Sequence, residues 1–85
     1  MTILKVSADS NAKKTAGSIT KSILNGEEVE VQAIGEKAVN QSVKAIAISR
    51  GQLALNGIDI RCIPAFFNVK FNGANYSGIK FIIDF

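Results

Sequence analysis

The spacing of apolar and polar residues predicts strands at both ends of this chain and two helices between them. Residues 2–7 and 28–34 alternate with the two-residue period of strands that have one buried face. Between them, apolar residues from Ala12 to Ile23 recur at intervals of four, three and four, which predicts an amphipathic helix. Asn25-Gly26 follows as a typical helix stop.

A second helix is predicted from Gly35 to Gly51, with a glycine at each end and apolar residues on two sides. One side is centred on Val39, with Val43 and Ile46 beside it, and the other side carries the remaining apolar residues. A domain of 85 residues buries only about two-thirds of its surface, so it cannot easily cover both sides. The second side is expected to meet another copy of the protein through Ala38, Ala45 and Ile48.

The last third of the chain again has the period of strands, in residues 58–62, 67–71 and 76–85. Pro64 is expected to break the third strand, because proline cannot donate a ladder hydrogen bond. The segment Asn72–Asn75 predicts a hairpin tip. The aromatic residues that fit a core-facing stripe are Phe67, Phe71, Phe81 and Phe85.

The predicted order is therefore β-α-β-α-β-β in one domain, residues 1–85. Two helices and one sheet form a two-layer α+β sandwich. Right-handed crossovers place both helices on one face of a mixed sheet of four or five strands, depending on whether Pro64 divides the third strand. The opposite face is expected to carry charges of both signs.

Composition is that of a globular protein, with 47% hydrophobic and 20% charged residues. No apolar run approaches the roughly 18 residues of a membrane span. The first ten residues lack the basic and apolar regions of a signal peptide. The single cysteine, Cys62, alternates in phase with Ile58 and Ile60, which indicates a small core residue. These features predict a cytoplasmic protein with no membrane partner.

The residue types needed for catalysis do not occur together. The chain has no histidine, which excludes a Cys–His pair and any histidine-containing metal site. Glu28 and Glu30 share a strand face that is expected to be open to water, which favours an ordinary solvated face over an acid–base pair. The serines have no partner base, and no glycine-rich phosphate loop is present. The sequence predicts no enzyme, no metal and no cofactor.

Net charge is +3, and the positive charge is concentrated on the two predicted helices. The loop SADSNAKK at residues 7–14 lies at a helix N-terminus, where free N–H groups and the helix dipole favour a phosphate. Lys13 and Lys14 add charge there, and Ser10 and Asn11 can donate hydrogen bonds. This pattern favours nucleic-acid contact; the alternative is a pair of ordinary solvated helix faces.

Four segments in order, ILKVSADSN, VQAIGEKAVNQSVKAIAISRG, GIDIRCIPAF and IKFIIDF, span nearly the whole chain. They resemble stage V sporulation protein S, a small family from spore-forming and some other bacteria. The resemblance implies an Alba-like fold with the element order predicted above. It also implies a regulatory role in spore development.

Alba proteins are dimeric DNA- or RNA-binding proteins, so the resemblance implies DNA or RNA as partner and a homodimer or higher oligomer. They use the first loop, the second helix and an extended hairpin arm. On this chain the loop corresponds to residues 10–14 and the arm to residues 70–75. The corresponding helix positions are Lys37, Asn40, Gln41 and Lys44.

These observations predict a nucleic-acid-binding regulatory protein that contacts the phosphate backbone as a dimer with little sequence selectivity. The predicted binding residues are Ser10, Asn11, Lys13, Lys14, Lys37, Asn40, Gln41 and Lys44. The alternative is a protein-interaction module in a sporulation or developmental pathway that does not bind nucleic acid. The low net charge favours that alternative.

Overall fold

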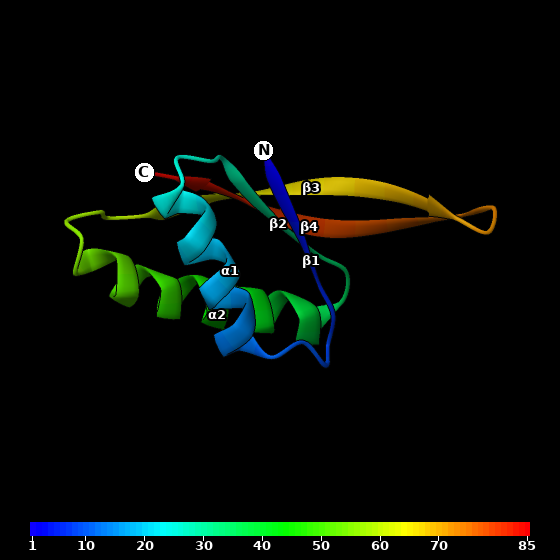
Figure 1. Ribbon diagram of the computed structural model, residues 1–85. Coiled ribbons are helices and arrows are strands. Elements are labelled where there is room, and N and C mark those ends of the chain that lie inside the picture. The colour runs from blue at the N-terminus through cyan, green and yellow to red at the C-terminus, as the bar shows by residue number, and fades with distance from the viewer.

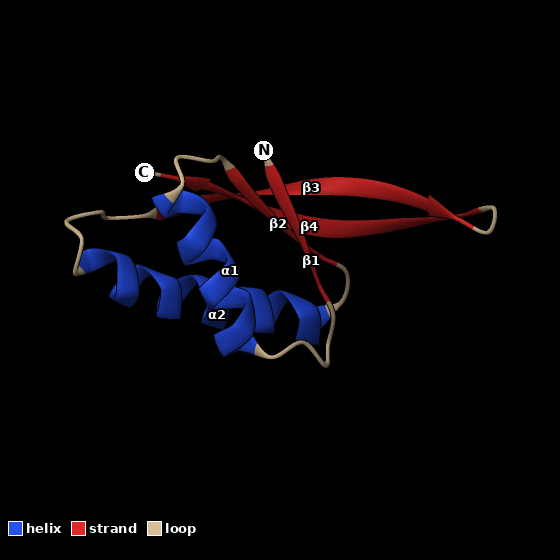
Figure 2. Cartoon of the chain, viewed as in Figure 1, coloured by secondary structure: helices blue, strands red, loops and turns tan.

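A computed structural model describes residues 1–85 as two helices packed on one face of a four-stranded sheet (Figures 1 and 2). The elements are β1 (Thr2–Val6), α1 (Ala12–Leu24), β2 (Val29–Ala33), α2 (Glu36–Ala54), β3 (Arg61–Phe71) and β4 (Ala74–Asp84). The strand order is β1-β2-β4-β3, with β1 parallel to β2 and β4 antiparallel to both of its neighbours. The predicted two-layer α+β sandwich is confirmed, with four strands.

Helix α1 begins and ends where the sequence predicts. The Asn11 side chain caps its first turn, because its Oδ1 accepts a hydrogen bond from the Lys14 backbone N–H at 3.1 Å. Ala16 and Ile19 on its inner face are fully buried. The helix ends before Gly26, which has a φ of 77° that glycine adopts without strain.

Helix α2 is longer than the sequence predicts, because it continues through Gly51 to Ala54. A glycine inside a helix costs about 1 kcal/mol relative to alanine. The extra turn buries Leu53, which has 0% exposure, and burying a leucine contributes about 1.5–3 kcal/mol. The free energy gained by burying Leu53 exceeds the cost of Gly51 in the helix. The helix therefore ends only before the turn at Gly57, whose φ is 73°.

The inner face of α2 consists mainly of small residues rather than of valines. Its buried positions include Ala38, Ser42, Ala45 and Ser49, spaced at four, three and four residues. Small side chains let α1 lie close against α2, and the Thr20 hydroxyl joins the two helices through Ser49 Oγ at 2.8 Å.

This placement corrects two sequence predictions about α2. Val43, expected on the buried side, is 49% exposed. Ala38 and Ala45, expected at an interface, are only 1% and 0% exposed within a single chain. They present no surface to a second copy, because α1 and the sheet already cover them.

Strand β3 is continuous through Pro64, so the predicted break is wrong. The strand lies at the edge of the sheet and pairs only with β4. An edge strand tolerates proline, because only one of its two sides takes part in the ladder. The sheet therefore has four strands and no fifth.

Strands β3 and β4 extend beyond the rest of the sheet as a two-stranded ribbon, here defined as residues 67–78 (Figure 1). Strand β2 pairs with β4 only between Ile79 and Ile83, so the ribbon residues pair with each other alone. The ribbon gives the molecule its longest dimension, 44 Å against 22 and 17 Å.

The aromatic stripe predicted to face the core is divided between the two faces of the sheet. Phe81 is buried under the helices, with 6% exposure. Phe67 pairs with Gly78 of β4. Gly78 is three residues before Phe81, and residues an odd number apart in a strand point to opposite faces, so Phe67 lies on the other face. Phe71 and Phe85 are 63% and 53% exposed, because no layer covers that face or the ends of these strands.

Candidate nucleic-acid interface

A groove of about 610 Å³ lies between the first turn of α1 and the middle of α2. It brings together Asn11 and Lys13 from the start of α1 with Gln41 and Lys44 from α2. These are four of the eight residues predicted to bind nucleic acid, and they come from segments about 30 residues apart in the sequence.

Hydrogen bonds hold the loop before α1 against α2. Gln41 Nε2 donates to the Ser10 carbonyl oxygen at 2.7 Å, which ties the two segments together across the sequence. Ser10 Oγ in turn accepts a hydrogen bond from the Ser7 backbone N–H at 2.9 Å. Ser10, Asn11 and Gln41 thus shape the groove through contacts within the chain, in addition to any contact with a ligand.

The groove is positively charged. No acidic residue lines it, and Lys13 and Lys44 take part in neither of the two ion pairs of the chain, Arg50–Asp59 and Lys80–Glu30. The α1 dipole adds positive potential at the same end of the groove, because the first N–H groups of a helix lack partners within it. The arrangement can therefore hold an anion between two lysines that stay exposed to solvent.

The other predicted residues lie outside the groove. Lys14, Lys37 and Asn40 are exposed but do not line it. Lys37 nevertheless lies four residues before Gln41, on the same side of α2 as the groove residues of that helix. It can extend the positive surface along α2 by one turn.

The floor of the groove is apolar and consists of Ala12, Ala47 and Ile48. The two alanines are not among the predicted binding residues, and Ile48 is predicted to lie at a subunit interface. Ile48 is partly buried against the core, and its role at an interface stays a prediction. One signal was present in the sequence, since Gln41, Lys44 and Ile48 are spaced at three and four residues and therefore share one side of the helix.

Neither helix combines the length and the apolar composition needed to cross a membrane. No group of three acidic or cysteine side chains comes together as metal ligands would.

The chain has the Alba-type α+β fold. Alba from Thermoplasma volcanium matches it with a TM-score of 0.69 over 98% of this chain and 99% of that one, at 13% sequence identity. At this identity the likeness shows the fold alone.

Residues 2–85 match the model of the stage V sporulation protein S (SpoVS) family. The chain therefore belongs to the SpoVS family, and the resemblance noted in the sequence is confirmed.

Proposed function

We propose that this protein is a sporulation regulator that binds nucleic acid as a dimer, through the phosphate backbone and with little sequence selectivity. The observation that carries the proposal is the groove that Lys13 of α1 and Lys44 of α2 line together, with no acidic residue in the lining. Membership of the SpoVS family supports the regulatory role.

Each groove residue has a physical part in the proposal. Lys13 and Lys44 attract a phosphate from two sides, and the N-terminus of α1 adds its unpaired N–H groups. The amide nitrogen of Asn11 can donate a hydrogen bond, since only the Oδ1 of that side chain is used in capping. Lys14 and Lys37 extend the basic surface on either side. None of these contacts depends on the base sequence.

In the proposed dimer, the second copy packs on the helix side of the sheet, over the part that the helices of this chain do not cover. The helices pack mainly against β1 and β2. Phe66 of β3 is 79% exposed on the same side of the sheet, and Val43 of α2 is 49% exposed. Covering these side chains with a second copy would remove apolar surface from water. The proposed interface thus moves from Ala38 and Ala45 to Val43 and Phe66.

Salt dependence of binding tests the phosphate contacts. If a dimer engages about six phosphates, log K should fall against log salt with a slope of about −5 on duplex DNA. Replacing Lys13→Ala with Lys44→Ala should flatten the slope by about 3 to 4, because each dimer loses four contacts. Lys21→Ala with Arg61→Ala is the matched control, since it removes the same charge outside the groove.

Electrophoretic mobility assays at low salt give these slopes for duplex DNA, single-stranded DNA and RNA. No shift for any of them at about 100 μM protein, which is at the weak end of non-specific binding, would reject the proposal. If Lys21→Ala with Arg61→Ala changes the slope equally, the groove is not the nucleic-acid-binding site. Light scattering tests the dimer, which Phe66→Asp should convert to a monomer.

A protein-interaction module without nucleic-acid binding is the second candidate. The exposed Val43 and Phe66 and the modest net charge of +3 favour it. A defined protein partner that stays bound after nuclease treatment, together with no mobility shift, would decide for this candidate.

A further inference from the structure

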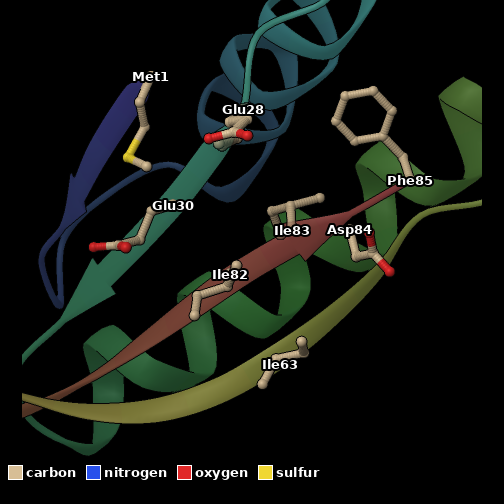
Figure 3. A pocket seen from close by; sticks show the side chains of 9 residues that line it. Met1, Glu28, Glu30, Ile63, Ile82, Ile83, Asp84 and Phe85 are labelled. Atoms are coloured by element: carbon tan, nitrogen blue, oxygen red, sulfur yellow. The ribbon is translucent and has the colours of Figure 1, made fainter.

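A second hollow, of about 350 Å³, lies on the open face of the sheet, opposite the helices (Figure 3). Ile63 of β3 and Ile82 of β4 stand side by side in the sheet and form its apolar floor. They are 55% and 37% exposed, although both are large aliphatic side chains. Met1 and Phe85 add further exposed apolar surface at the rim.

All charged side chains that line this hollow are acidic, namely Glu28, Glu30 and Asp84. Glu30 is held in place, because it lies 3.8 Å from Lys80 Nζ and accepts a hydrogen bond from Gln32 at 2.7 Å. Glu28 and Asp84 form no ion pair within the chain. Two carboxylates beside the apolar floor thus lie outside the ion pairs of the chain.

The sign of this charge excludes the hollow from the phosphate-binding surface proposed above. The basic groove lies on the helical layer, so the two surfaces are on opposite sides of the sheet. A ligand that fits the hollow must carry a positive charge next to an apolar body. Arginine and lysine have this character themselves, because their aliphatic stems pack on apolar surfaces while their charged ends reach a carboxylate.

We propose that the acidic hollow binds a protein partner through an extended segment in which arginine or lysine alternates with apolar residues. The apolar side chains cover Ile63 and Ile82, and the cationic groups pair with Glu28 and Asp84. Arginine fits best, since its planar guanidinium can contact a carboxylate through two hydrogen bonds. The protein then joins a nucleic acid on one side to a protein on the other.

Fluorescence anisotropy with a labelled peptide of alternating leucine and arginine tests this binding. We expect saturable binding by the intact protein. Two further peptides serve as comparisons, one with glutamate in place of arginine and one with serine in place of leucine. Both should bind at least about tenfold more weakly, which corresponds to about 1.4 kcal/mol.

Variants then locate the site. Glu28→Gln with Asp84→Asn raises the net charge by two and should weaken peptide binding about tenfold. Asn68→Lys with Ser77→Lys raises it by the same amount on the ribbon, on the other side of the sheet, and should leave binding nearly unchanged. Ile63→Ser should weaken binding by a similar factor without changing any charge.

Three outcomes would overturn the proposal. The first is that the leucine–arginine peptide does not bind saturably, and the second is that the serine peptide binds equally well. The third is that Glu28→Gln with Asp84→Asn lowers the assembled mass in light scattering. That result would mean that a second copy of the chain occupies the hollow. Failure here is distinguishable from failure of the nucleic-acid proposal. Glu28→Gln with Asp84→Asn should keep oligonucleotide binding, and Lys13→Ala with Lys44→Ala should keep peptide binding.

Discussion

The two halves of the sheet have the same alternating pattern but differ in burial. In β2, Val29, Val31 and Ala33 are at most 2% exposed, because the helices cover their face. In the ribbon, Val69 and Phe71 alternate with polar residues in the same way, yet Phe71 is 63% exposed. The alternation of residues therefore predicts a strand, whereas burial depends on whether a second layer lies over it.

The difference extends to stability. A two-stranded ribbon is marginally stable alone, so residues 67–78 depend on their attachment to the rest of the sheet. The rest of the molecule, residues 1–66 and 79–85, is here called the body. Its stability depends on burial between its two layers. Changes in the body should act on the whole fold, whereas changes in the ribbon should act locally.

The largest expected effect is that of Ile19→Ala in the body. Ile19 is fully buried on α1, and removing its side chain should lower the free energy of unfolding by about 2–5 kcal/mol. Phe71→Ala in the ribbon is the comparison and should change it by no more than about 0.5 kcal/mol. Urea unfolding followed by circular dichroism measures both. Equal losses would show that the ribbon belongs to the cooperative core.

Gly78→Ala should act where the two halves join. A Cβ atom there would stand 2.5 Å from Phe67 Cε1 and 2.6 Å from the Ala33 carbonyl oxygen. The ring can turn aside, but the backbone oxygen cannot, so we expect a loss of about 1–3 kcal/mol in the same unfolding experiment. Adding Phe67→Leu should recover only part of it. An unchanged unfolding midpoint would mean that β2 is free to move away from β4.

Gly73→Ala should loosen the ribbon alone. Gly73 has a φ of 77° at the hairpin tip, a conformation that costs alanine about 1–2 kcal/mol. Amide hydrogen exchange at Val69 and Tyr76 should become about 5–30 times faster. Exchange at Val31 in β2 should not change, and a uniform acceleration along the chain would contradict the separation of the two halves.

The smallest effect concerns the thiol of Cys62, on the part of β3 that adjoins the body. Desolvation by burial raises the pKa of Cys62, so less of the reactive thiolate is present at pH 8. The comparison is an exposed cysteine introduced by Asn68→Cys in a variant that also carries Cys62→Ser. Iodoacetamide at pH 8 should react more slowly with Cys62 than with the introduced cysteine. A faster reaction of Cys62 would show that the body does not shield this side chain.

The same pKa shift links stability to pH. Because the folded pKa lies above the ordinary thiol value of 9.0, the neutral thiol's contribution is fully present below that pH. It is lost as the pH rises through the folded pKa. The difference in unfolding free energy between the protein and Cys62→Ser should therefore shrink above about pH 9.

Much of the fold could be predicted from the sequence, because its elements carry their own end signals. Gly26 marks the end of α1 as its residue type suggests, and Asn11, in the loop at residues 7–14, caps the start of the helix. Gly51 and Pro64 misled the prediction, because each is overruled by a tertiary effect. Burial of Leu53 extends α2 past the glycine, and the edge position of β3 accommodates the proline.

The basic groove could be predicted only in part. Lys13 and Lys44 are recognisable as exposed charges, but their meeting depends on how closely α1 lies against α2. The distance between the helices is determined by small residues such as Ala45 and Ser49, which have little weight in a hydrophobic pattern. The acidic hollow was harder to foresee, because it joins residues of β2, β3 and β4 through the strand register.

Pro64 also has a consequence for the behaviour of the protein in a crowded cell. The outer edge of β3, a strand of eleven residues, has no partner strand, and such an edge is a template on which foreign chains can grow into fibrils. A chain aligned along β3 would find no N–H to bond at residue 64, so a continuous intermolecular ladder would be interrupted there. Pro64, which led to the wrong prediction of a strand break, thus hinders polymerisation of the folded protein along β3.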